Sequence, residues 1–225
     1  MRFLATASRG EVGALLLTPT APSALLVLAH GAGAGMEHTF MERLARALAE
    51  RGVATFRYQF PYAAAGGRRP DPPAVLEATV RAAVAAGAAA APGLPVFAGG
   101  KSMGGRMTSR AAAAGSVIDA AGIVFFGFPL HGAGGPRSVK RAAHLAEVSQ
   151  PMLFLQGTRD ALADLGLMTG VCEALPRATL HVVDGGDHGF HVLKRSGRDD
   201  GAVIAELADV CAAWMERHAG AHPSG

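Results

Sequence analysis

The sequence has few charged residues, few aromatic residues and very few cysteines. Of its 225 residues, 17% are charged, 6% are aromatic and two are cysteine, Cys172 and Cys211. A chain that is 50% hydrophobic with so little charge is not a disordered polyelectrolyte, and two cysteines in helix-like stretches do not make a disulfide framework. The composition therefore predicts a compact protein whose thiols are small buried groups.

Long hydrophobic runs are also lacking. The apolar residues 3–5 are soon interrupted by Ser8, Arg9, Gly10 and Glu11, which is unlike the apolar stretch of a signal peptide. The longest apolar stretch, residues 82–91, contains Gly87 and is shorter than the ~20 residues that a membrane span needs. We therefore expect a cytoplasmic protein without a membrane partner.

Basic clusters and metal-binding motifs are scarce as well. The net charge of +3 comes from arginines spread along the chain, with short pairs such as Arg68 and Arg69 but no long basic run. The sequence contains neither an H-E-x-x-H nor a C-x-x-C motif. These absences predict no nucleic-acid partner, no metal and no cofactor, and nothing in the sequence indicates an oligomeric state.

Strand-like and helix-like segments alternate from Ala24 onward. This alternation predicts an α/β protein with a mostly parallel central sheet and helices on both faces. The connections are too short for a cap domain, so we expect one domain over residues 1–218 and a frayed tail over 219–225. Strands are expected at 11–17, 24–29, 53–58, 94–98, 120–127, 152–156 and 178–183, and helices at 38–51, 73–90, 103–114, 137–147, 161–175 and 199–217.

The segment around Ser102 predicts a nucleophile. A short apolar strand is followed directly by the G-x-S-x-G motif, with glycines at 100 and 104, and then by a helical pattern. Glycines two residues before and after the serine allow the strand and the helix to approach each other at a tight, strained turn. A phosphate-binding P-loop would need glycine at position 95, which is Pro95.

A glycine-rich loop follows the strand expected at residues 24–29. It begins at His30 and has glycines at 31, 33 and 35. Acyl transfer requires two backbone N–H donors for the developing oxyanion, and we assign them to Met103 and to Ala32 or Gly33. A dinucleotide fingerprint would need a third glycine at position 36, which is methionine, and His30 is expected to be a structural hydrogen-bonding group.

A serine nucleophile needs a histidine base and a carboxylate that orients it. In hydrolases with this turn, the acid and then the histidine follow the serine at the ends of later strands. Asp160 and His188 lie at those places. Asp164 is expected one turn into the next helix, Asp187 is expected to be a loop carboxylate, and His191 is kept as the alternative base.

Five segments together resemble the KANSL/Tex-type α/β-hydrolases, which are relatives of the dienelactone hydrolases. The segments lie between residues 24 and 191, and Gly-Lys-Ser-Met-Gly-Gly-Arg and Gly-Thr-Arg-Asp are the most specific of them. The resemblance implies an α/β-hydrolase fold with Ser102, Asp160 and His188 as catalytic residues. It also implies cleavage of an ester, thioester or lactone, and the serine in place of the usual cysteine of dienelactone hydrolases favours an ordinary ester or thioester.

Two further residues and one alternative function complete the expectations. His131 and Arg106 are expected near the mouth of the site, where they could contact a polar or anionic part of a small-molecule ester. Because some members of the group that this chain resembles are scaffold subunits, a non-catalytic interaction module remains the alternative to a serine hydrolase.

Overall fold

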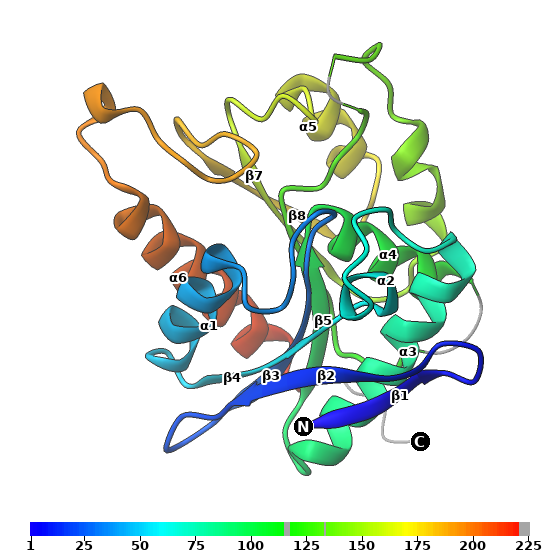
Figure 1. The fold of residues 1–225 in the computed structure, drawn as a ribbon. Coiled ribbons are helices and arrows are strands. Elements are labelled where there is room, and N and C mark those ends of the chain that lie inside the picture. Colours follow the sequence, from blue (N-terminus) through cyan, green and yellow to red (C-terminus); the bar gives the residue numbers. More distant parts are fainter. Residues whose placement is uncertain (115–117, 133, 221–225) are drawn as a thin grey trace.

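The structure is a computed structural model that describes residues 1–114, 118–132 and 134–220. Most of the expected tail, residues 221–225, lies outside the described residues, and Ala219 and Gly220 form a turn after the last helix. The centre of the molecule is an eight-stranded sheet (Figure 1). Its strands are β1 (Arg2–Thr6), β2 (Gly10–Leu17), β3 (Ala24–Ala29), β4 (Val53–Tyr58), β5 (Val96–Lys101), β6 (Ile123–Phe126), β7 (Met152–Gly157) and β8 (Ala178–Val183).

The strand order is β1-β2-β4-β3-β5-β6-β7-β8. Strands β3 to β8 are parallel to one another, whereas β2 pairs antiparallel with both β1 and β4 at one edge. All carboxyl ends of the parallel strands therefore face the same side of the sheet, and the loops that follow β3, β5, β7 and β8 start there.

Helices cover both faces of the sheet (Figure 1). Helices α1 and α6 pack with each other over one face, and α3 and α4 pack on the opposite face. The helical segments are α1 (Thr39–Ala49), α2 (Pro61–Ala64), α3 (Pro73–Ala90), α4 (Met103–Ala113), α5 (Leu165–Glu173) and α6 (Asp200–His218), with 3₁₀ turns η1 (Lys140–Glu147) and η2 (Lys194–Ser196).

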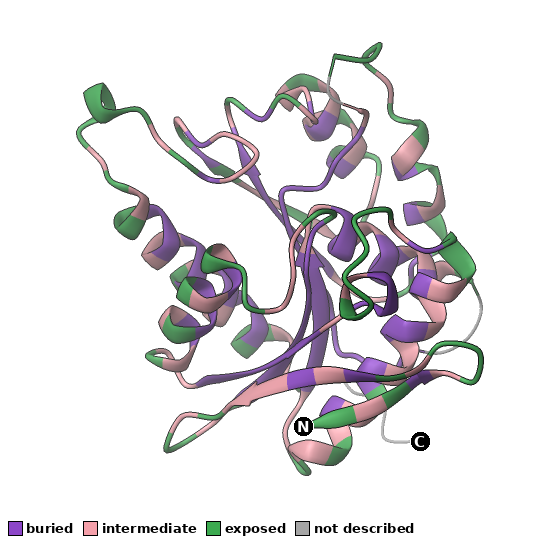
Figure 2. Cartoon of the chain, viewed as in Figure 1, coloured by how far each residue is buried: buried purple, intermediate pink, exposed green. Residues whose placement is uncertain are grey.

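The central strands of the sheet are buried over most of their length (Figure 2). In β3, Leu26 and Leu28 pack in the cluster under α1 and α6, whereas Leu25 and Val27 pack in the cluster under α3 and α4. A strand that is covered on both faces carries apolar residues at every position, which is why β3 is a continuous hydrophobic run. The cysteines are free and buried in α5 and α6, as expected.

Helix α3 has the length and apolar composition of a membrane-crossing helix, but here it packs against the sheet. A β-carbon at Gly87 would lie 2.8 Å from Cγ2 of Val27 and 3.4 Å from the Phe56 ring. The inner surface of α3 thus packs closely against β3 and β4, as helices do on the central sheet of an α/β protein.

The structure differs from the expected elements in several places. Strand β1 and the short helix α2 were not predicted, and the segment expected as an α-helix at 137–147 is the 3₁₀ segment η1. Helix α5 begins at Leu165 instead of 161, because residues 158–164 form the loop that carries Asp160. In β1 only Ala5 is buried, so this edge strand lacks the apolar pattern that marks the other strands.

Candidate active site

Ser102 lies at the turn between β5 and α4. Its backbone has φ 52° and ψ −115°, a strained conformation for a residue with a side chain. The Ser102 N–H donates to the carbonyl of Phe126 at 3.1 Å, and the Ser102 carbonyl accepts from Arg106 N–H at 3.1 Å. The turn is thus fixed on one side by β6 and on the other by the first turn of α4.

The two glycines that flank this turn are required by close backbone contacts. A β-carbon at Gly100 would lie 2.5 Å from the Ala29 carbonyl oxygen, and one at Gly104 would lie 2.5 Å from the same oxygen. No side chain fits at either position without moving β3 away from α4. This crowding is the clearance that the G-x-S-x-G spacing predicts.

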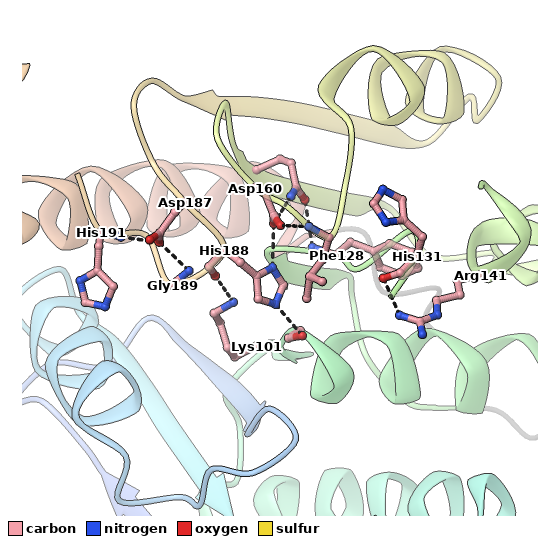
Figure 3. Close-up of polar contacts among 12 residues, drawn as sticks. Lys101, Phe128, His131, Arg141, Asp160, Asp187, His188, Gly189 and His191 are labelled. Atoms are coloured by element: carbon pink, nitrogen blue, oxygen red, sulfur yellow. Dashed lines mark hydrogen bonds and ion pairs between the residues drawn. The ribbon is translucent and has the colours of Figure 1, made fainter. Parts of the chain in front are cut away.

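His188 lies in the loop after β8, and its ring bridges Ser102 and Asp160. Figure 3 shows the His188 ring facing Asp160. The ring Nε2 lies 2.8 Å from Oγ of Ser102, and the ring Nδ1 lies 2.7 Å from Oδ2 of Asp160. The Asp160 side chain is fully buried and the His188 side chain is 25% exposed. Three residues that are far apart in the sequence therefore meet at the carboxyl edge of the sheet, in the arrangement that the sequence predicts.

Asp160 is held as a hydrogen-bond acceptor by two further donors. Nε2 of Gln156 donates to Oδ2 at 2.5 Å, and the N–H of Leu162 donates to Oδ1 at 2.7 Å. A carboxylate that accepts from several donors requires the facing imidazole nitrogen to donate. His188 Nδ1 therefore carries the proton in the neutral ring, which leaves Nε2 free to accept the hydroxyl proton of Ser102.

The Lys101 side chain contacts the loop that carries His188. Its Nζ donates to the His188 carbonyl oxygen and lies 5.8 Å from the Phe40 ring centre and 5.3 Å from that of Phe190. Burial lowers the Lys101 pKa to about 8, although the negative charges of Asp160 and Asp187 act in the opposite direction. An ammonium group beside two stacked aromatic rings thus fixes the backbone of the residue that contacts Ser102.

The alternative acids and bases have other partners. Asp164 is the N-cap of α5, where it accepts from Leu167 N–H, and so lies at the start of the helix and not one turn inside it. Asp187 is a loop carboxylate, as expected, and accepts from the N–H groups of Gly189 and His191. The exposed His191 ring contacts Asp200 at 2.6 Å and makes no contact with Ser102 among the described residues.

His30 is a structural residue of the glycine-rich loop. Its ring is buried and has a partner at each nitrogen. Nδ1 lies 2.8 Å from the Gly31 carbonyl oxygen, and the Phe60 N–H donates to Nε2 at 3.1 Å. Burial lowers the His30 pKa to about 4, so the ring is neutral near pH 7. The loop is thereby tied to the chain segment that follows β4.

The two candidate oxyanion donors lie on either side of Ser102. Met103 is the first residue of α4, where the N–H group has no acceptor within the helix. Ala32 lines both hollows beside Ser102, whereas Gly33 lines neither. Between the two residues proposed from the glycine-rich loop, the position of Ala32 is therefore the more suitable one for a donor to a substrate oxygen.

Two hollows open beside Ser102. The first has a volume of about 390 Å³ and contains His188 together with the apolar side chains of Phe40, Phe190 and Ile204. The second has a volume of about 430 Å³ and is bounded by Met103 and by residues from α3, α4 and η1. A bound carbonyl group at Ser102 can thus extend in two directions that differ in chemistry.

The two expected substrate contacts are placed differently. Arg106 lines the second hollow, one turn of α4 beyond Ser102. The His131 ring lines neither hollow; its Nδ1 faces the Gly132 carbonyl at 3.1 Å, and its own carbonyl accepts from Arg141 at 2.8 Å (Figure 3). His131 thus lies close to the site through its backbone and through the arginine that it holds.

Three residues near the site were not identified from the sequence as parts of it. Gln156, Lys101 and Arg141 contact the acid, the base loop and the second hollow, respectively. Gln156 carries a usable signal, because a polar residue that ends an otherwise apolar buried strand needs a buried partner. The contacts of the two basic residues depend on side-chain directions that spacing does not define.

Several solved structures have a similar fold. An α/β serine hydrolase homologue from Coxiella burnetii matches with a TM-score of 0.74 and 18% identity, over 96% of this chain and 97% of that chain. A dienelactone hydrolase from Anabaena variabilis matches with a TM-score of 0.72 and 18% identity, over 97% and 98%. A lidless α/β serine hydrolase from Xanthomonas campestris matches with a TM-score of 0.73 and 20% identity, over 99% and 95%.

These similarities confirm the predicted α/β-hydrolase fold over nearly the whole chain. A comparison with curated protein sequences found no match. The family profile described as an alpha/beta hydrolase domain matches residues 22–216, which include Ser102, Asp160 and His188. The chain therefore belongs to the α/β-hydrolase domain family.

Proposed function

We propose that the chain is a serine hydrolase that cleaves a carboxylic ester, thioester or lactone through an acyl-enzyme on Ser102. The observation that carries this proposal is the 2.8 Å contact between Nε2 of His188 and Oγ of Ser102. A serine hydroxyl is not ionised near neutral pH, so it becomes a nucleophile only when a positioned base removes its proton. His188 is such a base, and Asp160 orients its ring.

The proposed reaction has two halves. In the first, Ser102 Oγ attacks the carbonyl carbon, His188 Nε2 takes the hydroxyl proton, and the N–H groups of Met103 and Ala32 stabilise the oxyanion. His188 then gives the proton to the leaving alcohol or thiol. In the second half, water attacks the acyl-enzyme with His188 again as the base, and the carboxylic acid leaves with Ser102 restored.

The substrate class rests on the site and on the family. The carbonyl would lie where the two hollows meet, and a small ester fits because the site opens to solvent through both. Structures of similar fold include an esterase domain from Rhodothermus marinus and a dienelactone hydrolase, which favours an acyl-transfer reaction. We also propose, from the motif resemblance, that the chain belongs to the KANSL/Tex-type group within the family.

Covalent labelling tests whether Ser102 is a nucleophile. A fluorophosphonate probe forms a stable adduct with an activated serine, which intact mass spectrometry detects as a defined mass increase. We expect one adduct on the wild-type chain and none on Ser102→Ala. Ser109, whose Oγ lies 2.8 Å from His144, provides a matched control, because Ser109→Ala removes a second serine–histidine pair and should leave labelling intact.

Turnover provides the second test. We expect Ser102→Ala to lower kcat on 4-nitrophenyl butanoate by ~10⁴-fold or more while the circular dichroism spectrum is unchanged. An unlabelled wild-type chain, or equal turnover in the two proteins, would refute the enzyme hypothesis and favour a non-catalytic interaction module.

A further inference from the structure

The second hollow beside Ser102 has a basic wall. Arg106 enters it from α4 and Arg141 from η1, while Ser102 and Met103 form its floor. Each residue of an α-helix advances about 1.5 Å, so the Arg106 backbone lies only about 6 Å along α4 from Ser102. Arg106, Arg141 and Ser102 line the same hollow of about 430 Å³, so a group bound by the arginines here is close to a carbonyl held at Ser102.

Neither arginine is neutralised by the protein. Among the described residues, Arg106 and Arg141 form no ion pair with a carboxylate, and the buried Nε of Arg106 has no hydrogen-bond partner. Arg141 uses Nη1 to donate to the His131 carbonyl at 2.8 Å. The Nε atom of Arg106 is closed to solvent, so an anion in the hollow would accept from the terminal nitrogens of the guanidinium groups.

The other charged groups nearby are already paired. Arg110, on the next turn of α4, contacts Glu77 at 2.6 Å. Asp71 is the carboxylate that lines the second hollow, and it contacts Arg9 at 2.6 Å and accepts from the Tyr62 N–H at 2.9 Å. The hollow therefore keeps an uncompensated positive charge.

The pKa of Arg106 is consistent with an uncompensated positive charge in the hollow. This pKa is lowered, first by burial and then by the positive charges of Arg141 and Arg110, whereas Glu77 acts weakly in the opposite direction. The guanidinium group remains protonated near neutral pH. An anion between the two arginines would relieve their mutual repulsion.

We propose that the arginine-lined hollow binds a carboxylate on the substrate, so that the enzyme prefers esters that also carry a free carboxylate group a few bonds from the scissile carbonyl. This inference rests on the proposed function, because it takes Ser102 as the point at which the carbonyl is held. Planar guanidinium groups bind carboxylates through paired N–H donors, and the first hollow, which is mainly apolar although Arg43, Lys101 and Asp200 also line it, is left for the uncharged part of the substrate.

Binding to the inactive variant tests this proposal without turnover. Ser102→Ala would be titrated by ligand-observed NMR with monomethyl glutarate and with methyl pentanoate, which differ only in a terminal carboxylate and a methyl group. A second pair, 3-(butanoyloxy)propanoate and propyl butanoate, places the carboxylate on the alcohol side. We expect at least ~10-fold tighter binding of the carboxylate in one pair, as charge-assisted hydrogen bonds provide.

Substitutions then assign the preference to the two arginines. Arg141→Gln and Arg106→Gln, each in the Ser102→Ala background, should reduce the carboxylate preference by about tenfold, and Arg141→Lys should restore part of it. The matched control is Arg137→Gln, which removes an exposed arginine that pairs with Asp164 and should leave the preference unchanged. Thermal unfolding checks that each variant is folded.

Two outcomes would overturn the proposal. Equal binding of carboxylated and neutral ligands in both pairs would show that the hollow does not select an anion. A preference that survives in both Arg141→Gln and Arg106→Gln would place the anion elsewhere. Either result is separable from failure of the proposed function, which the labelling of Ser102 reports independently.

Discussion

Lys101 is a buried cation next to the candidate nucleophile, and its burial makes a measurable prediction about stability. Its pKa is lowered from 10.5 to about 8, chiefly because burial disfavours the charged ammonium group. At ~1.4 kcal/mol for each pKa unit, this difference corresponds to about 3 kcal/mol that the charged lysine costs the folded state. Replacing Lys101 by methionine removes this cost.

The sign of the pH dependence follows from where the proton is bound. Below pH 8 the lysine is protonated in both the folded and the unfolded state, so the cost is fully present. Between pH 8 and 10.5 the unfolded chain binds more protons than the folded one, and the free energy of unfolding rises with pH. Above pH 10.5 both states are neutral at this residue and the cost is gone.

Urea unfolding of wild type and Lys101→Met at several pH values measures this effect. We expect the free energy of unfolding of wild type, minus that of the variant, to increase by about 2–3 kcal/mol between pH 7.5 and 10. The lost hydrogen bond to the His188 carbonyl adds an offset of ~1 kcal/mol that is nearly independent of pH. Burial raises the pKa of Cys172 to about 11 and that of Cys211 to about 12, so ionisation of these thiols in the unfolded chain lowers the stability of both proteins over this range. This contribution is common to wild type and variant and cancels in the difference.

A matched control separates burial from a simple loss of charge. Lys194 is exposed in η2, so Lys194→Met removes the same charge without relieving a buried group. Its difference from wild type should stay constant over the same pH range. If the difference for Lys101→Met is also constant, or falls with pH, the ammonium group is not destabilised by burial and the reasoning is refuted.

Four further substitutions test the turn, the base and the acid. Gly104→Ala should cost several kcal/mol or prevent folding, because its β-carbon would lie 2.5 Å from the Ala29 carbonyl oxygen; a urea midpoint close to that of wild type would contradict this. His188→Ala should lower kcat on 4-nitrophenyl butanoate by ~10⁴-fold, whereas His191→Ala should change it less than about twofold, and the reverse pattern would identify His191 as the base. Asp160→Asn should lower kcat by ~10²–10⁴-fold with little change in KM, and unaltered turnover would remove Asp160 from the catalytic residues.

The central strands were predictable because burial on both faces leaves a simple pattern. Strands β3 and β7 are buried at every position, and each appears in the sequence as a short apolar run. Strand β1 lacks this pattern because it is an edge strand with one buried residue, Ala5, and is held by backbone pairing with β2 and by the packing of Phe3 against Phe56 of β4. Pairing of this kind depends on the partner strand and not on local composition.

The three candidate catalytic residues were predictable for a topological reason. In a parallel sheet, every strand ends at the same edge, so residues that follow β5, β7 and β8 are brought together whatever their distance in the sequence. Ser102 follows β5 directly, and Asp160 and His188 lie in the loops that follow β7 and β8. Asp164 lies at the start of α5, beyond the loop, and for this reason is outside the cluster.

The contacts that tune the site were not predictable in the same way. Gln156 lies on β7, four residues before Asp160, and its amide reaches both Asp160 and the Phe128 N–H. Lys101 and Arg141 reach backbone carbonyls in loops whose paths no local pattern specifies. Such contacts depend on rotamers and loop conformations, which are set by tertiary packing.

Leu162 connects the orientation of the acid to the division between the two hollows. Its N–H donates to Asp160 at 2.7 Å and its carbonyl accepts from the His131 N–H at 3.1 Å, so its backbone is fixed on both sides. Together with Ser102 and Ala32 it lines both hollows. If Ser102 holds the substrate carbonyl as proposed, the same loop that orients the acid also separates the apolar substituent from the anionic one. Substrate selection and alignment of the base would then depend on one short segment between β7 and α5.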